Sequence, residues 1–351
     1  MVILTLVRWA MLPIGIAILL LTWGSLLHTV TGPRGRTARL ARYLGRFVEF
    51  VTVQVARRMH GERRERMLSL TGPVAFLVVL AGWLVGFVIG YSLIISSLVG
   101  QGPGAAFTNA ARATFLVGLD ANVSILTTFV SFAAAMNGLV VVTLELAYLP
   151  SLYAAYNRRE VLAALVARRC QGRLTGVELL CRHFEIGAGD RLGPLYGEWE
   201  HWVADLTETH TNYPILTTFR SPEPNEHWLI AFLTMLDAAA LHAVVSPMTC
   251  PPEAALLIEA GTVCLNRIAR ARRDARFPTG QEERDDAMVE RAFHRLRATS
   301  TPLVEDVRPM LRRFHLARAH YLPLVRALAG RLYVNVEAAA PRQEAAVYER
   351  D

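Results

Sequence analysis

Three long apolar stretches alternate with polar segments in the first 156 residues of the chain. They cover residues 9–30, 73–99 and 123–156, and the one acid among them is Glu145, in the third stretch. A helix of about 20 apolar residues crosses the hydrocarbon core of a bilayer. Each stretch is therefore predicted to form a membrane-spanning helix, and the third is long enough to tilt or to project beyond the bilayer.

The first stretch follows Arg8 and could also be the apolar part of a signal peptide. It is longer than such a part usually is, and no cleavage site of small residues follows it cleanly. We therefore expect an uncleaved transmembrane helix within residues 1–31.

The arginines between the apolar stretches predict the orientation. Residues 32–72 contain ten arginines against three glutamates, and residues 158–169 contain four arginines, whereas residues 100–122 contain one arginine and one aspartate. Basic loops stay in the cytoplasm, so the N-terminus and residues 100–122 should face out. The predicted organisation is a transmembrane helix (1–31), a basic cytoplasmic linker (32–72), a membrane module (73–156) and a helical cytoplasmic domain (157–351).

Apolar and aromatic residues alternate with arginines along the linker, at a spacing that places many of them on one side of a helix. Such a helix suits the inner membrane interface, where residues 34–66 would contact anionic lipid. A helix packed on the protein's own cytoplasmic domain explains the pattern equally well, and both interpretations stay open.

The residues after 157 have helical periodicity and almost no alternation of the kind that strands require. An all-α domain of about 190 residues is large enough to bury its own core. Turns at Gly, Pro or Ser divide it into the predicted helices 160–170, 176–185, 194–211, 225–245, 251–273, 282–298 and 303–332.

The composition agrees with a membrane protein, because 53% of the 351 residues are hydrophobic and only 19% are charged. Soluble domains have about 25% charged residues. The formal net charge is +7, but all 37 basic residues are arginine, which points to a GC-rich genome more than to nucleic-acid binding. No nucleic-acid partner is expected.

The chain shows no pattern of residues that is typical of catalysis. The four cysteines lack CxxC spacing, and neither an HExxH metal motif nor a phosphate-binding GxxxxGK[ST] loop is present. We expect no catalytic residues, no resident metal or cofactor, and no enzymatic activity.

The segment between the second and third stretches is too short to cross a bilayer. Glycines and a proline at 100–104 should end the second helix, residues 105–114 favour a short helix, and 115–122 should be extended. Non-helical backbone survives at membrane depth only where protein or water surrounds it. The segment is therefore predicted to be re-entrant and to line an oligomeric pore.

A short helix, the sequence that follows it and a long inner helix together resemble the pore module of potassium-channel-like proteins, specifically a bacterial two-pore-domain potassium channel-like family. The expected fold is an all-α membrane protein with one extra transmembrane helix, a pore-loop module (outer helix 73–99, pore helix and filter 104–122, inner helix 123–156) and an all-α cytoplasmic domain. The residues in the filter position are Thr114, Phe115, Leu116, Val117, Gly118, Leu119 and Asp120. Similar cytoplasmic segments are 149–153, 158–161, 176–180, 199–202 and 209–216.

This resemblance implies a homotetramer in a bacterial inner (plasma) membrane that conducts monovalent cations passively, with potassium as the first candidate. The alternative is a non-conducting, membrane-anchored scaffold or sensor with a degenerate pore loop.

The filter departs from the T-V-G-Y-G-D pattern whose carbonyl oxygens replace the water shell of potassium. In one register Val117-Gly118-Leu119 replaces Val-Gly-Tyr and Asp120 stands in the place of the second glycine. In the other, Asp120 keeps the acidic position and Val117 and Leu119 displace both glycines. The first is favoured slightly, because Asp tolerates positive φ better than Val or Leu. Weakly selective conduction, potassium preference through a looser cage and no conduction all remain open.

The inner helix carries Asn137, Val141, Glu145 and Tyr148 on one stripe, at i, i+4, i+8 and i+11. If this stripe lines the pore, Glu145 forms a ring of acids that attracts cations; otherwise it pairs with a linker arginine near the inner boundary. Gly138 is either a gating hinge or a place of close helix packing.

Overall fold

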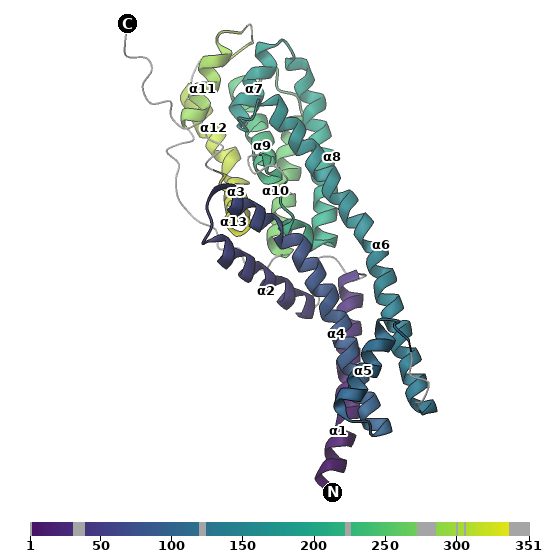
Figure 1. Cartoon of the computed structure of the whole chain (residues 1–351). Coiled ribbons are helices and arrows are strands. Elements are labelled where there is room, and N and C mark those ends of the chain that lie inside the picture. The colour runs from purple at the N-terminus through teal and green to yellow at the C-terminus, as the bar shows by residue number, and fades with distance from the viewer. Residues whose placement is uncertain are drawn as a thin grey trace. The chain divides into compact units, whose positions relative to one another are not determined.

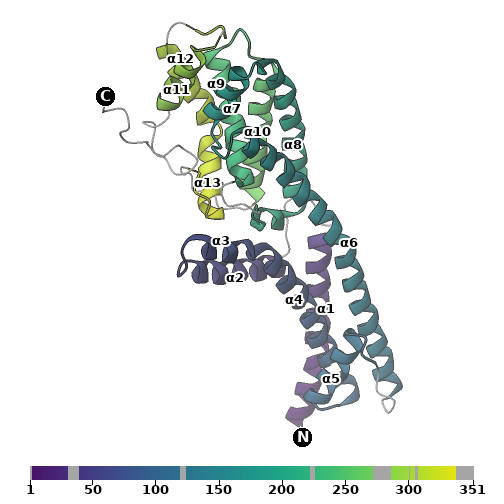
Figure 2. The same ribbon diagram turned by 45° about the horizontal axis from the view of Figure 1, so that its top comes forward.

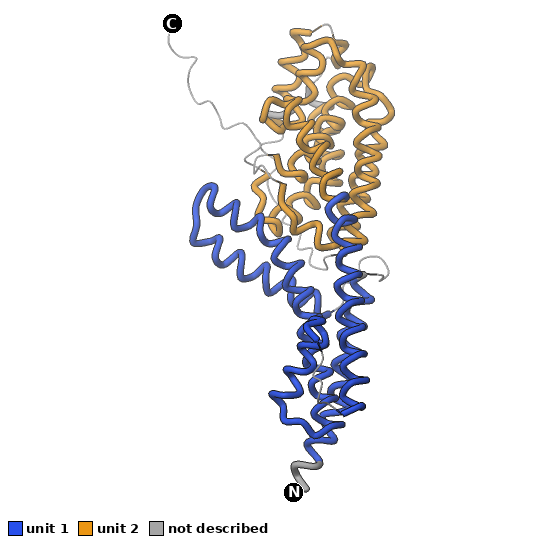
Figure 3. The backbone as a smooth tube through the Cα atoms, turned by 45° about the vertical axis from the view of Figure 1, so that its right-hand side comes forward, with its two compact units in different colours: residues 1–154 blue, residues 155–351 orange. Residues whose placement is uncertain are grey.

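The computed structural model describes residues 2–30, 39–118, 124–221, 226–271, 286–299, 301–304 and 307–336. Within these ranges the chain is helical and contains no strand, which confirms the expected all-α class. The chain divides into two compact units, unit 1 (residues 1–154) and unit 2 (residues 155–351), coloured separately in Figure 3.

Unit 1 contains three long apolar helices and three shorter ones (Figure 1). Its elements are α1 (Val2–Val30), α2 (Arg39–Ala56), α3 (Gly61–Ser69), α4 (Thr71–Val99), α5 (Pro103–Thr114) and the first part of α6 (Ile125–Arg169). The helices α1, α4 and α6 are long and apolar enough to cross a membrane, as the sequence predicted. The third is not confined to residues 123–156, because α6 continues without a break through Pro150 to Arg169.

The helices α1 and α4 pack closely because small residues lie at their contact. A Cβ added at Gly15 would lie 2.8 Å from the carbonyl oxygen of Gly90. Small residues allow such backbone approach between membrane helices, where the hydrophobic effect contributes little. The indole Nε1 of Trp83 also donates to Ser25 Oγ at 3.0 Å, which links α4 to α1 inside an apolar environment.

The amphipathic linker forms two helices, α2 and α3, that run alongside each other (Figure 2). One face of α2 packs on α4, where Thr71 donates a hydrogen bond to Thr52 at 3.0 Å. The opposite face exposes aromatic side chains, among them Tyr43, Phe47 and Phe50. The helix therefore presents one face to protein and one apolar face outward.

Unit 2 surrounds one helix, α9 (Trp228–Val245), with the others. It consists of the end of α6, α7 (Gly176–Glu185), η1 (Gly189–Arg191), α8 (Leu192–Asn212), η2 (Pro214–Thr218), α9, α10 (Glu253–Ala271), α11 (Asp286–Leu296), α12 (Val307–Ala319) and α13 (Leu322–Leu332). By length and composition α9 could also cross a membrane, but 94% of it is buried inside the unit. It is apolar on all sides because it is the core of this helical domain.

Two expected helices of the cytoplasmic half are wrong in their limits. Residues 160–170 are not a separate helix but the end of α6, and 303–332 is not one helix but α12 and α13. The second break precedes Pro323, whose ring and missing N–H are tolerated in the first turn of a helix but not in its interior.

Buried charges in unit 2 are paired. Asp237 of α9 accepts two hydrogen bonds from Arg318, at 2.9 and 3.0 Å, and one from the hydroxyl of Tyr321 at 2.7 Å. The three side chains come from α9, α12 and the start of α13, so this polar cluster fixes how those helices meet.

Candidate functional site

The short helix α5 turns back immediately after α4. The helix α4 ends at Val99, and Gly100 follows in the left-handed conformation with φ of 71°. Arg8 of α1 covers this end, since its Nε donates to the carbonyl oxygen of Ser97 at 2.7 Å, where a cation is favourable. Asn109 of α5 then donates to the Gln101 side chain at 3.0 Å, which fixes the turn between the two helices.

One face of α5 consists of small residues and packs mainly on α4. Ala106, Ala110 and Ala113 recur every three or four residues along it and are buried. They belong to the same cluster as Tyr91 of α4 and Val141 of α6. The buried face of the short helix is therefore part of the apolar core of unit 1.

The C-terminal end of α5 meets α6 in the middle of its apolar part. A Cβ added at Gly138 would overlap the carbonyl oxygen of Thr114, so only glycine allows this contact. Gly138 lies 13 residues after Ile125, the first residue of α6, which corresponds to about 20 Å along a helix. Close packing thus explains Gly138 without a hinge, and a gating role for it stays a prediction.

Residues 115–117 form a helix-ending turn, so the expectation that 115–122 is extended is wrong over this part. The N–H of Val117 bonds to the Arg112 carbonyl at 2.9 Å and that of Leu116 to the Ala113 carbonyl at 3.0 Å, which is a Schellman motif. Leu116 takes the left-handed position, with φ of 59°, where glycine is usual. Thr114 is buried at the helix end, whereas Phe115 to Val117 are exposed in the single chain.

The remaining filter positions are less informative. Gly118 has φ of 125°, a conformation that favours glycine. Leu119 and Asp120 lie outside the described residues, so neither filter register is tested.

The inner-helix stripe faces α4 of the same chain. Asn137 donates to the hydroxyl of Tyr91, and Tyr148 stacks on Phe76 with ring centroids 6.3 Å apart. Val141 between them is fully buried. A pore-lining role for this stripe requires a free face and stays a prediction.

Glu145 lies on the same stripe and is 9% exposed. Its Oε2 has no hydrogen-bond partner among the described residues, so the alternative of a pair with a linker arginine is not seen in that part of the chain. A buried carboxylate at this position is costly and is by default a functional candidate.

Another face of α6 is exposed and strongly apolar in the single chain. Large side chains recur along it: Phe129, Phe132, Met136, Leu139, Val142, Leu146 and Leu149. A surface of this kind is normally covered by lipid or by another protein copy.

Two segments on which the resemblance rests meet around one buried arginine of unit 2. Arg159 is paired with Glu160 at 2.7 Å and donates to the carbonyl oxygens of Leu216 and Phe219 at 2.9 and 2.8 Å. Its guanidinium also contacts His210 at 3.2 Å. The arginine thus joins α6 to the end of α8 and the η2 turn, which is a structural role.

The described residues offer little for metal or nucleophilic chemistry. No group of three or more His, Cys, Asp or Glu side chains that could hold a metal occurs among them. Burial raises the pKa of Cys170, Cys181 and Cys264 to about 12. These thiols remain protonated at neutral pH and are therefore poor nucleophiles.

No known protein family, curated protein or solved structure matches this chain. The resemblance to potassium-channel-like proteins therefore rests on the residues of this chain alone.

Proposed function

We propose that this chain is the pore-forming subunit of a homotetrameric, potassium-channel-like cation channel that conducts monovalent cations passively across a bacterial plasma membrane. The observation that supports it is the contact between the Thr114 carbonyl and Gly138. It brings the end of a 12-residue helix, too short to cross a bilayer, to the middle of the apolar part of a helix that is long enough to do so. A re-entrant helix of this kind is the central element of a pore loop.

Several copies of the chain are needed because the turn that follows α5 is uncovered in a single chain. Phe115, Leu116 and Val117 follow α5 and are exposed in the single chain. Irregular backbone at membrane depth is stable only where protein or water surrounds it. A closed ring of identical chains supplies both, since neighbours cover the apolar faces and a central passage holds water.

Cation preference is expected from the direction of α5. The C-terminal end of a helix carries a partial negative charge equivalent to about half an elementary charge. In the proposed ring, each α5 directs this end toward the centre of the membrane, where it stabilises a cation and disfavours an anion. The ring needs no resident cofactor to do so.

Selectivity for potassium over sodium is expected to be weak. A strict filter needs an extended strand whose successive carbonyls face the ion. Here the carbonyls of Arg112 and Ala113 accept the bonds that end α5, and Leu116 occupies the left-handed position. The same turn is what favours the alternative, a non-conducting membrane-anchored scaffold or sensor.

A flux measurement separates these functions. The full chain, reconstituted in liposomes, should release potassium and sodium down their gradients and retain chloride. Gly138→Ala forces α5 away from α6 and should abolish most of the flux. Gly24→Ala is the matched control, because a Cβ at Gly24 of α1 meets nothing within 4 Å.

Absence of monovalent-ion flux at every tested voltage and pH would remove the channel function and leave the scaffold. A fourfold assembly by mass measurement supports the proposed ring, whereas a monomer or dimer contradicts it.

We further propose that α2 lies in the inner membrane interface and contacts anionic lipid. Its outward face carries Tyr43, Phe47 and Phe50, and arginines such as Arg39 extend from the same helix. An arginine near an anionic surface contributes about 1 kcal/mol. In nanodiscs that contain brominated lipid, the fluorescence of the tryptophan added in a Phe47→Trp variant should be quenched. Unquenched fluorescence of this tryptophan would contradict the location of α2 in the membrane interface.

A further inference from the structure

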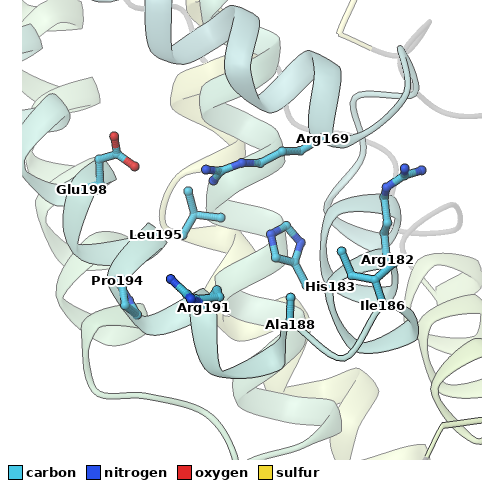
Figure 4. Close-up of a pocket in the computed structure, with 9 residues that line it drawn as sticks. All are labelled: Arg169, Arg182, His183, Ile186, Ala188, Arg191, Pro194, Leu195 and Glu198. Atoms are coloured by element: carbon cyan, nitrogen blue, oxygen red, sulfur yellow. The ribbon is translucent and has the colours of Figure 1, made fainter.

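A pocket of about 390 Å³ lies within unit 2, between the end of α6, α7, η1 and the start of α8 (Figure 4). Its lining combines cationic and apolar side chains: Arg169, Arg182, His183, Ile186, Ala188, Arg191, Pro194, Leu195 and Glu198. In Figure 4 the Arg169 side chain extends across the pocket above Leu195, and His183 lies between Arg169 and Arg191. Arginines from three different elements, α6, α7 and η1, therefore line one cavity.

Four arginines of unit 2 outside this pocket are paired with acidic side chains among the described residues: Arg158, Arg159, Arg295 and Arg318. Arg295 is paired with both Glu178 and Glu185 at 2.8 Å, and Arg318 with Asp237 at 2.9 Å. By contrast, no described acidic side chain forms an ion pair with Arg169 or Arg182.

Arg191 is only 4.0 Å from Asp190, and both side chains are 79% exposed, so that pair is weak. The pocket keeps an excess of positive charge that its own residues leave largely unbalanced.

His183 adds a hydrogen-bonding group but little positive charge. Its Nδ1 donates to the Leu179 carbonyl at 2.7 Å when the ring is neutral. Burial lowers the pKa of His183, and the neighbouring Arg169 and Arg182 lower it further, although the bond to Leu179 acts in the opposite direction. Three arginines and one carboxylate, Glu198, thus set the charge of the cavity near neutral pH.

We propose that this pocket binds a small organic phosphate of about the size of a mononucleotide. Arginine forms bidentate, charge-assisted hydrogen bonds with phosphate, and several arginines in one cavity are suited to a dianion. The wall formed by Ile186, Ala188, Pro194 and Leu195 suits an apolar or planar organic body. Sites for such ligands occupy about 300–1,000 Å³, a range that includes this pocket.

The start of α8 supports the same assignment. This 21-residue helix begins at Leu192, and no side chain caps its first turn. Arg191, the residue before this turn, lines the pocket together with Pro194 and Leu195 of the turn itself. The positive end of the helix dipole therefore adds to the arginines in favouring an anion.

The proposal does not depend on conduction by unit 1, and binding tests it directly. The full chain in nanodiscs of neutral phosphatidylcholine, in a buffer without phosphate, is titrated calorimetrically with AMP, pyrophosphate and adenosine. AMP and pyrophosphate should bind and adenosine should not. Arg169→Gln and Arg182→Gln should each weaken AMP binding at least tenfold, as expected for the loss of a charged hydrogen bond.

Arg168→Gln is the matched control, because Arg168 precedes Arg169 on α6 but is exposed and does not line the pocket. It should change the affinity less than twofold, and unchanged thermal unfolding of all variants shows that they fold. A short-chain phosphatidylglycerol provides a second source of phosphate. Tighter binding of this lipid than of AMP, lost in the same variants, assigns the pocket to a lipid headgroup.

The assignment is overturned if no phosphate compound binds up to about 10 mM. It is equally overturned if the pocket variants and Arg168→Gln bind alike.

Discussion

The helices α1 and α9 are almost equally apolar, yet 22% of α1 and 94% of α9 is buried inside the protein. Apolar side chains of α1, such as Leu21, face outward, whereas α9 is surrounded by the other helices of unit 2. The helix α9 also carries Asp237, whose charge is paired with Arg318. Hydropathy alone therefore does not distinguish a membrane helix from a core helix. The two differ in whether other helices of the same protein cover the apolar side chains.

The largest effect is expected at the charge inside α9. Asp237→Ala leaves Arg318 buried without its partner, which should lower the free energy of unfolding of unit 2 by about 3–5 kcal/mol. Asp205→Ala breaks the exposed pair with Arg158 and should cost less than about 1 kcal/mol. Urea unfolding of the full chain, followed by tryptophan fluorescence, measures both, and equal losses would contradict a buried core role for α9.

The apolar positions of the two helices give the next contrast. Leu236→Ala in α9 creates a cavity in the core and should cost about 2–5 kcal/mol. Leu21→Ala in α1 removes a side chain that is 73% exposed and should change the stability by less than about 0.5 kcal/mol. The same unfolding assay applies, and a large loss for Leu21→Ala would show that another chain covers α1.

The pH dependence gives the smallest of the three effects. Burial lowers the pKa of His242 in α9 from 6.5 to about 4. His242 binds a proton more tightly in the unfolded chain than in the folded one. Its neutral form therefore contributes fully to the free energy of unfolding above about pH 6.5, and this contribution is lost as the pH falls toward 4.

Unfolding at pH 7 and pH 4.5 should therefore differ by about 2–3 kcal/mol from this group. The difference should shrink in His242→Gln and persist in the control His201→Gln, which changes an exposed residue. Equal pH dependence in both variants would exclude His242 as its source.

Local sequence signals predicted most of the helices. The turn at Gly176 placed the start of α7 correctly. In the structure the Thr175 side chain caps this start by accepting from the Glu178 N–H at 3.1 Å. The run of small residues at 105–114 likewise predicted α5, which the structure begins two residues earlier at Pro103.

What the sequence could not predict depends on contacts between distant residues or on unusual backbone. Leucine rarely adopts positive φ, so nothing in the residues at 115–117 indicated the turn at Leu116. The contact of Gly138 with Thr114 joins positions 24 residues apart, and only the fold distinguishes packing from a hinge. Arg169, Arg182 and Arg191 come from three elements, so no local motif marks their pocket.

The close packing of α1 against the glycines of α4 has a consequence for the N-terminal helix. A Cβ at Gly90 would lie 2.6 Å from the Leu19 side chain, and one at Gly86 would lie 2.6 Å from the hydroxyl of Thr22. If a protease removed α1, these glycines would leave a furrow that no side chain of α4 can fill, and lipid tails fit such narrow spaces poorly. Removal of α1 would therefore lower the stability of the membrane unit, because these contacts with α4 would be lost.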